Sequence, residues 1–428
     1  MRGAKVSTTD PVATARPIPR APWRASLALL GPAFVASIAY VDPGNVAANL
    51  TAGARYGYLL VWVLVLANAM AMLVQYQSAK LGIVTGRTLP ELLAERMRPR
   101  ARVLYWLQAE IVALATDLAE VVGGAIALGL LFRVPLPLGA MIVGGVSMAL
   151  LAVQDHRTQQ RFEAAIIGLL AVITIGFLAG LVVSPLSPPG IASGLVPHFG
   201  GPDTVLLAAS MLGATVMPHA IYVHSALSRD RHRADPHTHV PPTAVARLLR
   251  GTRADVLIAL GLAGLVNIGM LLLAASTLRG RQGTDTIEGA HSSIVEALGP
   301  LVGTAFAIGL LASGLASTAV GSYAGSTIMQ GLLRRRVPVV VRRLVTLVPS
   351  VALLALGFDP TMSLVVSQVV LSFGIPFALV PLVRLASSRE LVGAFAMSPW
   401  VKAAAWTSAG LVIVLNLALV WLTFSSGV

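Results

Sequence analysis

Residues 39–49 have the sequence Ala-Tyr-Val-Asp-Pro-Gly-Asn-Val-Ala-Ala-Asn, in which Asp42-Pro43-Gly44-Asn45 interrupts an apolar segment. A helix cannot continue regularly through Pro43-Gly44, because proline lacks the backbone N–H and glycine weakens a helix. A second apolar segment is interrupted by Met217-Pro218-His219. Inside a membrane, the carbonyls freed by such breaks are tolerated only where protein, water or a ligand satisfies them. Paired breaks in two halves of a chain therefore predict a transporter's binding site near the middle of the membrane.

The composition places the chain among membrane proteins with many spans. Hydrophobic residues make up 56% and charged residues 11% of the 428 residues, and the mean hydropathy is +0.80. Such a chain is too apolar for a soluble protein. Hydropathy predicts an all-α polytopic protein with eleven transmembrane helices. The predicted spans are 24–50, 57–82, 103–131, 138–154, 162–184, 204–228, 254–278, 300–331, 339–357, 362–385 and 400–425.

The positive charge follows the membrane topology. The net charge is +13, which by itself would be compatible with nucleic-acid binding. With the N-terminus inside, however, 27 of the 31 basic residues fall on the cytoplasmic side. Only Arg55, Arg133, Arg279 and Arg281 fall on the other side. The positive-inside rule explains this distribution without nucleic acid. We expect a multi-pass protein of the cell membrane with a cytoplasmic N-terminus and an extracytoplasmic C-terminus.

The predicted spans divide into two sets of five and one extra helix. Each set begins with a broken helix, and the two sets have opposite orientations because five is odd. This pattern predicts an inverted 5+5 repeat with broken helices 1 and 6. The chain is then a disordered cytoplasmic tail (1–22), without the apolar core of a signal peptide, and a single transmembrane domain (23–428). Within that domain, repeat one is about 24–184, repeat two about 204–385 and the extra helix 400–425. We expect loops at 185–203, 229–253 and 279–299.

The two breaks supply the candidate metal ligands. Asp42 offers an anionic oxygen, Asn45 an amide oxygen, and Met217 a polarizable sulfur. Mg²⁺ and Ca²⁺ prefer shells made only of oxygen, so a sulfur ligand favours Mn²⁺, Fe²⁺, Co²⁺ or Cd²⁺. Most membrane methionines only fill gaps. Met217 is a better candidate because it directly precedes a helix-breaking proline. The chain has no cysteine, so neither a disulfide nor a thiolate metal site is available.

A second group of polar residues is acidic and lies in span three. Asp117 and Glu120 are three residues apart, hence on one helical face, and Glu110 lies nearer the cytoplasmic end. Membrane carboxylates on one stripe usually line a route for water or protons. The alternative is a buried ion pair with an arginine. Suitable arginines are Arg231 at the inner end of span six and Arg342 or Arg343 at the start of span nine.

Other polar residues within or near the spans leave their roles open. His219 follows Met217-Pro218 and can titrate near neutral pH, whereas His224 is more typical of a packed, hydrogen-bonded histidine. Gln368 in span ten is either a helix–helix hydrogen bond or a ligand that joins the site in one conformation. The loop 229–253 carries further histidines, for which a solvated linker is a better explanation than metal sensing. These histidines are His232, His237 and His239.

No motif of an enzyme is present. The sequence has no His-Glu-x-x-His zinc motif, phosphate-binding Gly-Lys-Ser/Thr loop or catalytic-triad motif. We therefore expect neither an enzyme nor an ATP-driven pump, and no prosthetic group. The energy for transport would come from an ion gradient or from the gradient of the substrate.

Five motifs together resemble those of a bacterial member of the natural resistance-associated macrophage protein (Nramp) family. The resemblance runs from about residue 28 to 425, and the pair of breaks is highly specific. One departure is Ala220, where many relatives have Asn; this change adjoins the site but removes no ligand. The motifs are Ala39-Tyr-Val-Asp42-Pro-Gly-Asn45, Ala115-Thr-Asp117-Leu-Ala-Glu120, Ala214-Thr-Val-Met217-Pro-His219, Tyr222-Val-His224-Ser-Ala-Leu227 and Ser367-Gln368-Val369.

The resemblance implies a fold and a set of functional residues. The fold would be that of sodium/amino-acid symporters. The family's metal ligands match Asp42, Asn45, Met217 and the carbonyl of Ala214, with the carbonyl of Ala39 and Gln368 joining in the other orientation. Family members that carry magnesium or aluminium lack the methionine, which this chain keeps. The residues that match the family's proton pathway are Asp42, His219, Glu120, Asp117, Arg343 and Arg231, and the acidic stripe adds Glu110.

These observations predict a proton-coupled importer of divalent transition metals that works by alternating access. Mn²⁺ is the expected substrate, followed by Fe²⁺, with Co²⁺ and Cd²⁺ also carried and H⁺ co-transported. Its partners would be metal ions, protons and the lipid bilayer, and no oligomer is required. Two alternatives stay open: a channel or uniporter without obligatory proton coupling, and a non-transporting metal receptor. Short cytoplasmic loops without a recognisable domain disfavour the receptor.

Overall fold

The computed structural model describes residues 31–152, 159–232, 240–284, 286–335 and 339–425. The predicted tail, the start of the first span, His237 and His239 lie outside the described residues. All regular structure in these ranges is helical. The helices are α2 (Pro32–Ser37), η1 (Ile38–Val41), α3 (Pro43–Tyr56), α4 (Val61–Thr85), α5 (Leu89–Arg96), α6 (Pro99–Phe132), α7 (Leu136–Ala152), α8 (Gln159–Val183), α9 (Pro188–Gly194), α10 (Pro202–Thr215), α11 (Pro218–His232), α12 (Pro242–Thr277), α13 (Ile287–Leu298), α14 (Pro300–Leu333), α15 (Val339–Ala355), α16 (Pro360–Ser387), α17 (Arg389–Val392), η2 (Gly393–Phe395) and α18 (Pro399–Ser425).

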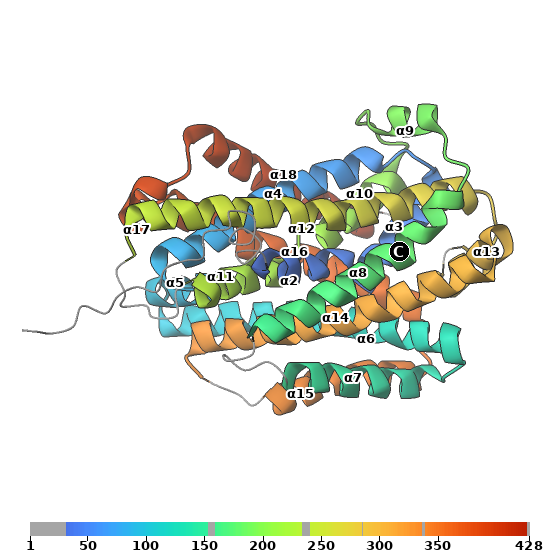
Figure 1. The fold of residues 1–428 in the computed structure, drawn as a ribbon, viewed down its shortest axis with the longest axis horizontal. Coiled ribbons are helices and arrows are strands. Elements are labelled where there is room, and N and C mark those ends of the chain that lie inside the picture. Colours follow the sequence, from blue (N-terminus) through green and yellow to red (C-terminus); the bar gives the residue numbers. More distant parts are fainter. Residues whose placement is uncertain (1–30, 153–158, 233–239, 285, 336–338, 426–428) are drawn as a thin grey trace, which may run out of the picture.

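The long helices lie side by side along one axis, as expected for a polytopic membrane protein (Figure 1). Within the described ranges, 8 helices are long and apolar enough to cross a membrane. Shorter apolar helices cover Pro32–Val41, Leu136–Ala149 and Arg343–Ala355, which coincide with predicted spans one, four and nine. The all-helical membrane fold is thus confirmed, whereas the number of eleven crossings stays a prediction.

Proline marks where many of these helices begin. The N–H of a helix's first residue has no partner within the helix, and the fixed φ of proline suits that position. The same residue type that breaks a helix in its interior therefore starts the next one. The prolines in this position are Pro32, Pro43, Pro99, Pro188, Pro202, Pro218, Pro242, Pro300, Pro360 and Pro399.

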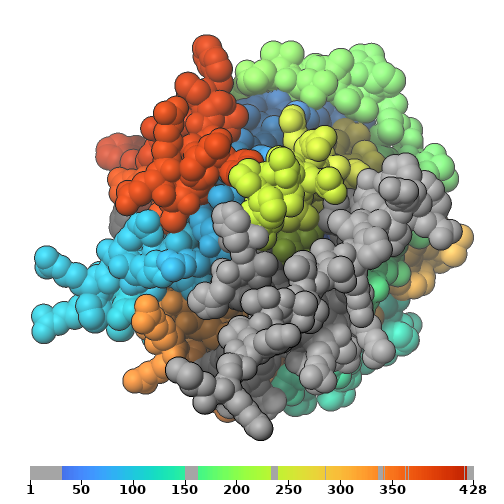
Figure 2. Space-filling view, turned by 60° about the vertical axis from the view of Figure 1, so that its left-hand side comes forward, coloured from blue at the N-terminus to red at the C-terminus, as the bar shows by residue number. Residues whose placement is uncertain are grey.

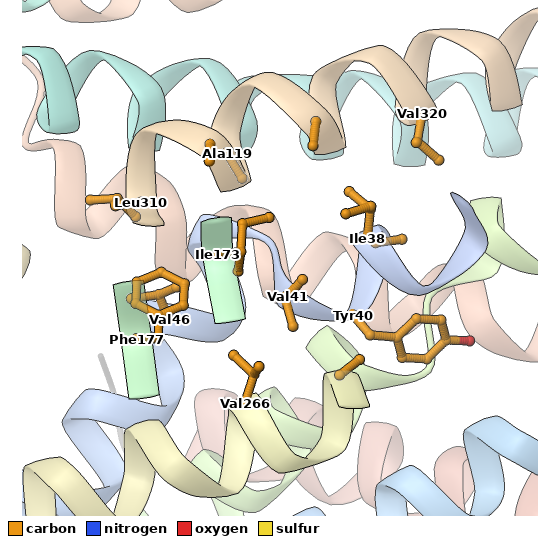
Figure 3. Close-up of a cluster of buried hydrophobic side chains, with 14 of the residues drawn as sticks. Ile38, Tyr40, Val41, Val46, Ala119, Ile173, Phe177, Val266, Leu310 and Val320 are labelled. Carbon is orange, nitrogen blue, oxygen red and sulfur yellow. The ribbon is translucent and has the colours of Figure 1, made fainter. Parts of the chain in front are cut away.

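Both predicted breaks are present. The first predicted span consists of α2 and the short 3₁₀ helix η1, followed by α3, which begins at Pro43 with Asp42 as its N-cap. The sixth span consists of α10 and α11, separated by Val216 and Met217. α2 and η1 lie deep in the molecule (Figure 1). In Figure 3, the side chains of Ile38, Tyr40 and Val41 are enclosed by residues of other helices.

The prediction of plain loops between spans was wrong in three places. α9 lies within 185–203, α13 within 279–299, and the first turns of α12 within 229–253. Polar N-caps explain the first two, because the side chains of Ser187 and Thr286 accept hydrogen bonds from the first turns of α9 and α13. The unpredicted α5 begins with a capping box formed by Thr88 and Glu91. Hydropathy does not detect such short, capped helices.

The two ends of the bundle are built differently. At one end, on the right of Figure 1, lie α9, α13 and the end of α3; at the other lie α5, α17 and the start of α12. Figure 2 turns the second end toward the reader and shows α5 and the start of α6, in light blue, between the region of α17 and the end of α14. We refer to these as the α13 end and the α5 end.

Candidate functional site

The first helix break brings a carboxylate and an amide together in the interior. Asp42 Oδ1 accepts a hydrogen bond from the backbone N–H of Asn45 at 2.8 Å and another from Asn45 Nδ2 at 2.7 Å. Asn45 Nδ2 also donates to the carbonyl oxygen of Ala214, at 2.8 Å. Asp42, Asn45 and Ala214 are fully buried. One amide group therefore links the break after η1 to the end of α10.

This arrangement can be converted into a cation site by one rotation. Asp42 Oδ1 and the Ala214 carbonyl oxygen both lie within hydrogen-bond distance of Asn45 Nδ2. If the amide turns, its oxygen faces the same space, and three oxygen atoms then converge where N–H groups lie now. Asp42 Oδ2 has no well-formed hydrogen bond to another described residue. The Gln368 amide and the Gly44 backbone N–H lie near this oxygen. A buried carboxylate is costly, so a cation beside it would be stabilised.

Gln368 of α16 lies against the same break. A methyl group at Gly44 would overlap the Gln368 amide and would lie 3.2 Å from Asp42 Oδ2, so glycine makes room for this side chain. Gln368 is buried, and neither of its amide atoms has a well-formed hydrogen bond to a described residue. Its amide lies beside the Asp42 carboxylate, so the structure is compatible with both roles that the sequence left open, a helix–helix hydrogen bond and a ligand.

Met217 and Ala39 lie at the breaks without a polar contact to Asp42. Met217 is fully buried in the non-helical link between α10 and α11, and Ala39 is buried in η1. No hydrogen bond between described residues joins either of them to the Asp42–Asn45 pair. The structure thus unites Asp42, Asn45 and the Ala214 carbonyl, with Gln368 beside them.

Side chains from two other helices satisfy the carbonyls of the first break. Asn267 Nδ2 of α12 donates to the Tyr40 carbonyl at 2.6 Å, and Asn49 Nδ2 donates to Asn267 Oδ1 at 2.9 Å. Ser313 Oγ of α14 donates to the Val41 carbonyl at 2.5 Å. The sequence analysis missed these residues. The signal for Asn267 was a single amide in an otherwise apolar stretch, whereas Ser313 is one of several hydroxyl residues in its span and gave no such signal.

The acidic stripe forms an ion pair with span nine. Arg343 Nη1 lies 3.1 Å from Asp117 Oδ1, and both side chains are buried. Glu120 is fully buried. Its carboxylate and that of Asp117 both face Gly321 of α14: a methyl group at Gly321 would lie 3.0 Å from Glu120 Oε2 and 3.5 Å from Asp117 Oδ1. Of the arginines considered from the sequence, Arg343 thus pairs with the stripe. The carboxylates share one face of α6, as predicted.

His219 lies near this stripe, and Glu110 lies further along α6. The Nδ1 atom of His219 is 3.5 Å from the hydroxyl oxygen of Thr116, the residue before Asp117. Glu110 is half-buried and lies about 10 Å before Asp117 along the helix. The stripe, His219 and Arg343 therefore occupy one region between α6, α11, α14 and α15.

Arg231 binds a different carboxylate, which the sequence analysis did not consider. Arg231 Nη1 lies 2.7 Å from Glu163 Oε2 of α8. Asp255 of α12 accepts hydrogen bonds from the backbone N–H groups of Gly31 and Ala33, at 3.1 and 2.9 Å. Glu163 and Asp255 lie just inside the predicted spans, and a carboxylate at such a position could have indicated a buried polar contact.

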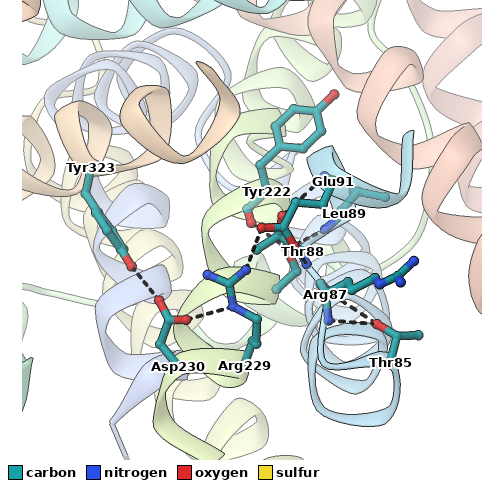
Figure 4. Close-up of polar contacts among 10 residues, drawn as sticks. Thr85, Arg87, Thr88, Leu89, Glu91, Tyr222, Arg229, Asp230 and Tyr323 are labelled. Atoms are coloured by element: carbon teal, nitrogen blue, oxygen red, sulfur yellow. Dashed lines mark hydrogen bonds and ion pairs between the residues drawn. The ribbon is translucent and has the colours of Figure 1, made fainter. Parts of the chain in front are cut away.

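Polar contacts also tie the end of α11 to its neighbours at the α5 end. Arg229 lies 2.7 Å from both Glu91 of α5 and Asp230, and the hydroxyl of Tyr323 donates to Asp230 at 3.4 Å (Figure 4). The backbone N–H of Leu89 donates to Ser225 Oγ at 3.0 Å. These contacts hold α11, α5 and α14 together at this end.

The α13 end, in contrast, opens into a cavity. Its volume is about 720 Å³, and Gly44 and Gln368 belong to its lining. Asp203, Asp359 and Arg55 also line it. We call this cavity the vestibule. Because Gly44 and Gln368 contact both the vestibule and the region of Asp42, the candidate site lies at the inner end of the vestibule.

A helical membrane bundle with two broken helices, and with ligand-type side chains at both breaks, defines a polytopic transporter. The chain belongs to the natural resistance-associated macrophage protein-like (Nramp) family, whose model matches residues 33–422. It is 56% identical over 407 residues to the divalent metal cation transporter MntH of Mycobacterium tuberculosis H37Rv, covering 94% of each chain. It is 42% identical over 406 residues to MntH of Bacillus subtilis, again covering 94% of each.

Solved structures agree with this assignment. A histidine-to-alanine mutant of the Eremococcus coleocola manganese transporter superposes with a TM-score of 0.84 at 31% identity, covering 95% of this chain and 88% of the other. MhsT in complex with L-phenylalanine superposes with a TM-score of 0.62 at 14% identity, covering 91% of this chain and 98% of the other. At that identity the second likeness concerns the fold alone. Together with the all-helical architecture, it confirms the predicted fold class.

Proposed function

We propose that this protein imports divalent transition metal ions, Mn²⁺ before Fe²⁺, in symport with protons and by alternating access. The observation that carries the proposal is the convergence of Asp42, Asn45 and the Ala214 carbonyl at the two helix breaks. One carboxylate with neutral oxygen donors binds a divalent ion without holding it irreversibly. The MntH relatives are divalent metal cation transporters and the structural neighbour is a manganese transporter, which supports a metal ion as the cargo.

Selectivity for transition metals would come from Met217. Its thioether is buried in the link between α10 and α11, three residues after the Ala214 carbonyl that faces Asn45. A sulfur ligand adds affinity for Mn²⁺, Fe²⁺, Co²⁺ and Cd²⁺, and adds little for Mg²⁺ or Ca²⁺. The carbonyl of Ala39 and the amide of Gln368 would complete the coordination in other conformations.

Proton movement would use the region beside the metal site. Asp42, His219, Glu120 and Asp117 form a set of titratable groups that leads from the first break to Arg343. Further groups that would extend the route toward the α5 end are Glu110 and Arg231. Keeping the proton route beside the metal route would allow both cations to move without competing for one path.

The proposed direction of transport follows from the charge distribution and the state of the two ends. By the positive-inside rule, the α5 end would lie in the cytoplasm. The vestibule then faces outward, while the contacts of α11 with α5 and α14 close the inner side. Movement of the broken helices, which contain α2 and α11, would open the inner side.

Reconstitution into liposomes tests the proposal. We expect Mn²⁺ to enter vesicles and to acidify their interior, and we expect Fe²⁺, Co²⁺ and Cd²⁺ to compete more strongly than Ca²⁺ or Mg²⁺. Empty liposomes are the control for leakage. Mn²⁺ entry without acidification would indicate a channel or uniporter instead. If the purified protein moved no metal, the non-transporting metal receptor would be the remaining alternative.

A further inference from the structure

Two prolines inside α16 free two backbone carbonyl groups. In an α-helix, the N–H of each residue donates to the carbonyl four residues earlier, and proline has no N–H. Pro376 and Pro381 lie within α16, so the carbonyls of Ser372 and Phe377 lose their regular partners. In a membrane, such groups need a donor from elsewhere.

Both carbonyls receive a hydrogen bond from another helix. Asn416 Nδ2 of α18 donates to the Ser372 carbonyl at 2.6 Å, and the Tyr105 hydroxyl of α6 donates to the Phe377 carbonyl. Asn416 is a buried amide in a helix that is otherwise largely apolar. Burying an amide in such a helix is costly unless the amide is hydrogen-bonded. Its partner here is the carbonyl that Pro376 leaves free.

The part of α16 around Ser372, to which Asn416 donates, packs against both helix breaks. Gln368, one turn before Ser372, lies over Gly44 in the first break. A methyl group at Gly213 of α10 would lie 2.8 Å from Ser372 Cβ, and one at Gly374 would lie 3.1 Å from Pro218 Cγ, at the start of α11. A proline inside a helix bends it, and these close approaches leave little space around α16, so a change in the bend at Pro376 would shift Gln368 relative to Asp42.

We infer that Asn416 is a positioning residue for Gln368, acting through the Ser372 carbonyl to stabilise the bend of α16 in which the vestibule is open. The inference rests on the proposed function and extends it to α18, the helix outside the predicted repeats. Only an interaction whose strength differs between two states shifts their populations. Without Asn416, the Ser372 carbonyl has neither an N–H nor an amide donor, so the bend relaxes and the vestibule closes.

The absence of cysteine in the chain allows a test that does not depend on transport. Ser210 lines the vestibule, so Ser210→Cys provides a single thiol whose rate of maleimide labelling reports the open state. In purified protein in detergent, we expect Asn416→Leu to lower this rate by about fivefold or more. The matched control is Ser408→Ala, because Ser408 lies in the same helix and donates only to Ala404 within it. The control should leave the rate within about twofold.

A second substitution separates positioning from general damage to the fold. Pro376→Ala restores an N–H that can pair with the Ser372 carbonyl, which makes Asn416 redundant. The double variant Asn416→Leu/Pro376→Ala should therefore label like Pro376→Ala alone, to within about twofold. If Asn416→Leu does not give monodisperse protein, Asn416→Ser, whose shorter side chain does not reach the carbonyl, takes its place under the same criteria.

The outcomes distinguish this inference from the proposed function. Unchanged labelling in Asn416→Leu, or additive effects in the double variant, would overturn the role of Asn416. In liposomes, Asn416→Leu should lower the maximal rate of Mn²⁺ uptake by about fivefold, and Pro376→Ala should abolish that difference. A Ser210→Cys parent that labels normally but moves no Mn²⁺ would refute the proposed function, while the labelling comparison still decides the role of Asn416.

Discussion

At the scale of single residues, Asp42 combines a structural and a chemical task. Its Oδ1 atom caps α3 by accepting the Asn45 N–H, and its carboxylate also lies beside the Gln368 amide of α16. Asparagine is an equally good N-cap residue. The structural task can therefore survive a substitution that removes the charge.

Asp42→Asn should consequently leave the protein folded and abolish transport. Loss of the only carboxylate at the breaks removes the strongest ligand, which we expect to lower Mn²⁺ uptake by about a hundredfold or more. The measurement is uptake at matched protein levels, with melting temperature as the check on folding. Asp203→Asn in the vestibule is the control for loss of a negative charge at a distance. Substantial uptake by Asp42→Asn would show that another residue is the central ligand.

Met217→Ala should change selectivity more than binding. The oxygen ligands can still hold Mn²⁺, but Cd²⁺, the softest of the expected substrates, should lose most affinity, and Ca²⁺ or Mg²⁺ should compete better. A tenfold change in relative inhibition corresponds to about 1.4 kcal/mol, a reasonable size for one neutral ligand. Competition of Cd²⁺ and Ca²⁺ against labelled Mn²⁺ measures it. Identical spacing of the inhibition constants in both proteins would mean that Met217 only packs.

Much of the site could be predicted from the sequence at this scale. Both helix breaks can be recognised because proline, with glycine and a charged residue at the first break, interrupts an apolar segment. Asn45 and Ala214 proved to be hydrogen-bonded across the breaks. Asn267, Ser313 and Asn416 could not be predicted. Each acts on a carbonyl far away in the sequence, and only tertiary packing determines which carbonyl that is.

At the scale of elements, α6 and α14 together create a buried acidic face. Gly321 on α14 leaves space for Glu120 and Asp117 of α6, and Arg343 of α15 pairs with Asp117. The helical periodicity of α6 was sufficient to predict a shared face. The short helices α5, α9 and α13 were not predicted, because their N-caps stabilise segments without an apolar stripe of membrane length.

Glu120→Gln should alter proton coupling while leaving metal binding nearly intact. Unlike Asp117, Glu120 has no arginine ion pair among the described residues, so its substitution leaves no cation unpaired. We expect the ratio of Mn²⁺ uptake at mildly acidic and mildly alkaline external pH to approach one, with Mn²⁺ affinity within about threefold of the wild type. Uptake and calorimetric titration measure the two quantities, with Glu288→Gln on α13 as control. Collapse of affinity with normal proton flux would place Glu120 in the metal site.

At the scale of the whole molecule, the described residues correspond to one state of a transport cycle. The vestibule reaches Gly44 and Gln368 from the α13 end, while ion pairs join α11 to α5 and α8 at the other end. Sequence patterns do not specify which end is open, because both states are built from the same residues and differ by small free energies. The sequence therefore predicts the fold class and the family but does not specify the conformational state.

Weakening the contact between α11 and α5 should shift the molecule toward the opposite state. Glu91→Gln removes the charge that pairs with Arg229, and this half-exposed pair contributes about 0.5 kcal/mol, enough for roughly a twofold change in population. Ser228 is buried beside this pair, so Ser228→Cys reports opening of the α5 end as Ser210→Cys reports the vestibule. In the Glu91→Gln background, labelling at 228 should rise while labelling at 210 falls, because the two ends open alternately. Glu95→Gln, which removes the exposed partner of Arg87, is the control and should change neither rate. A rise at both positions would indicate loosening of the bundle or a continuous channel, and would contradict alternating access.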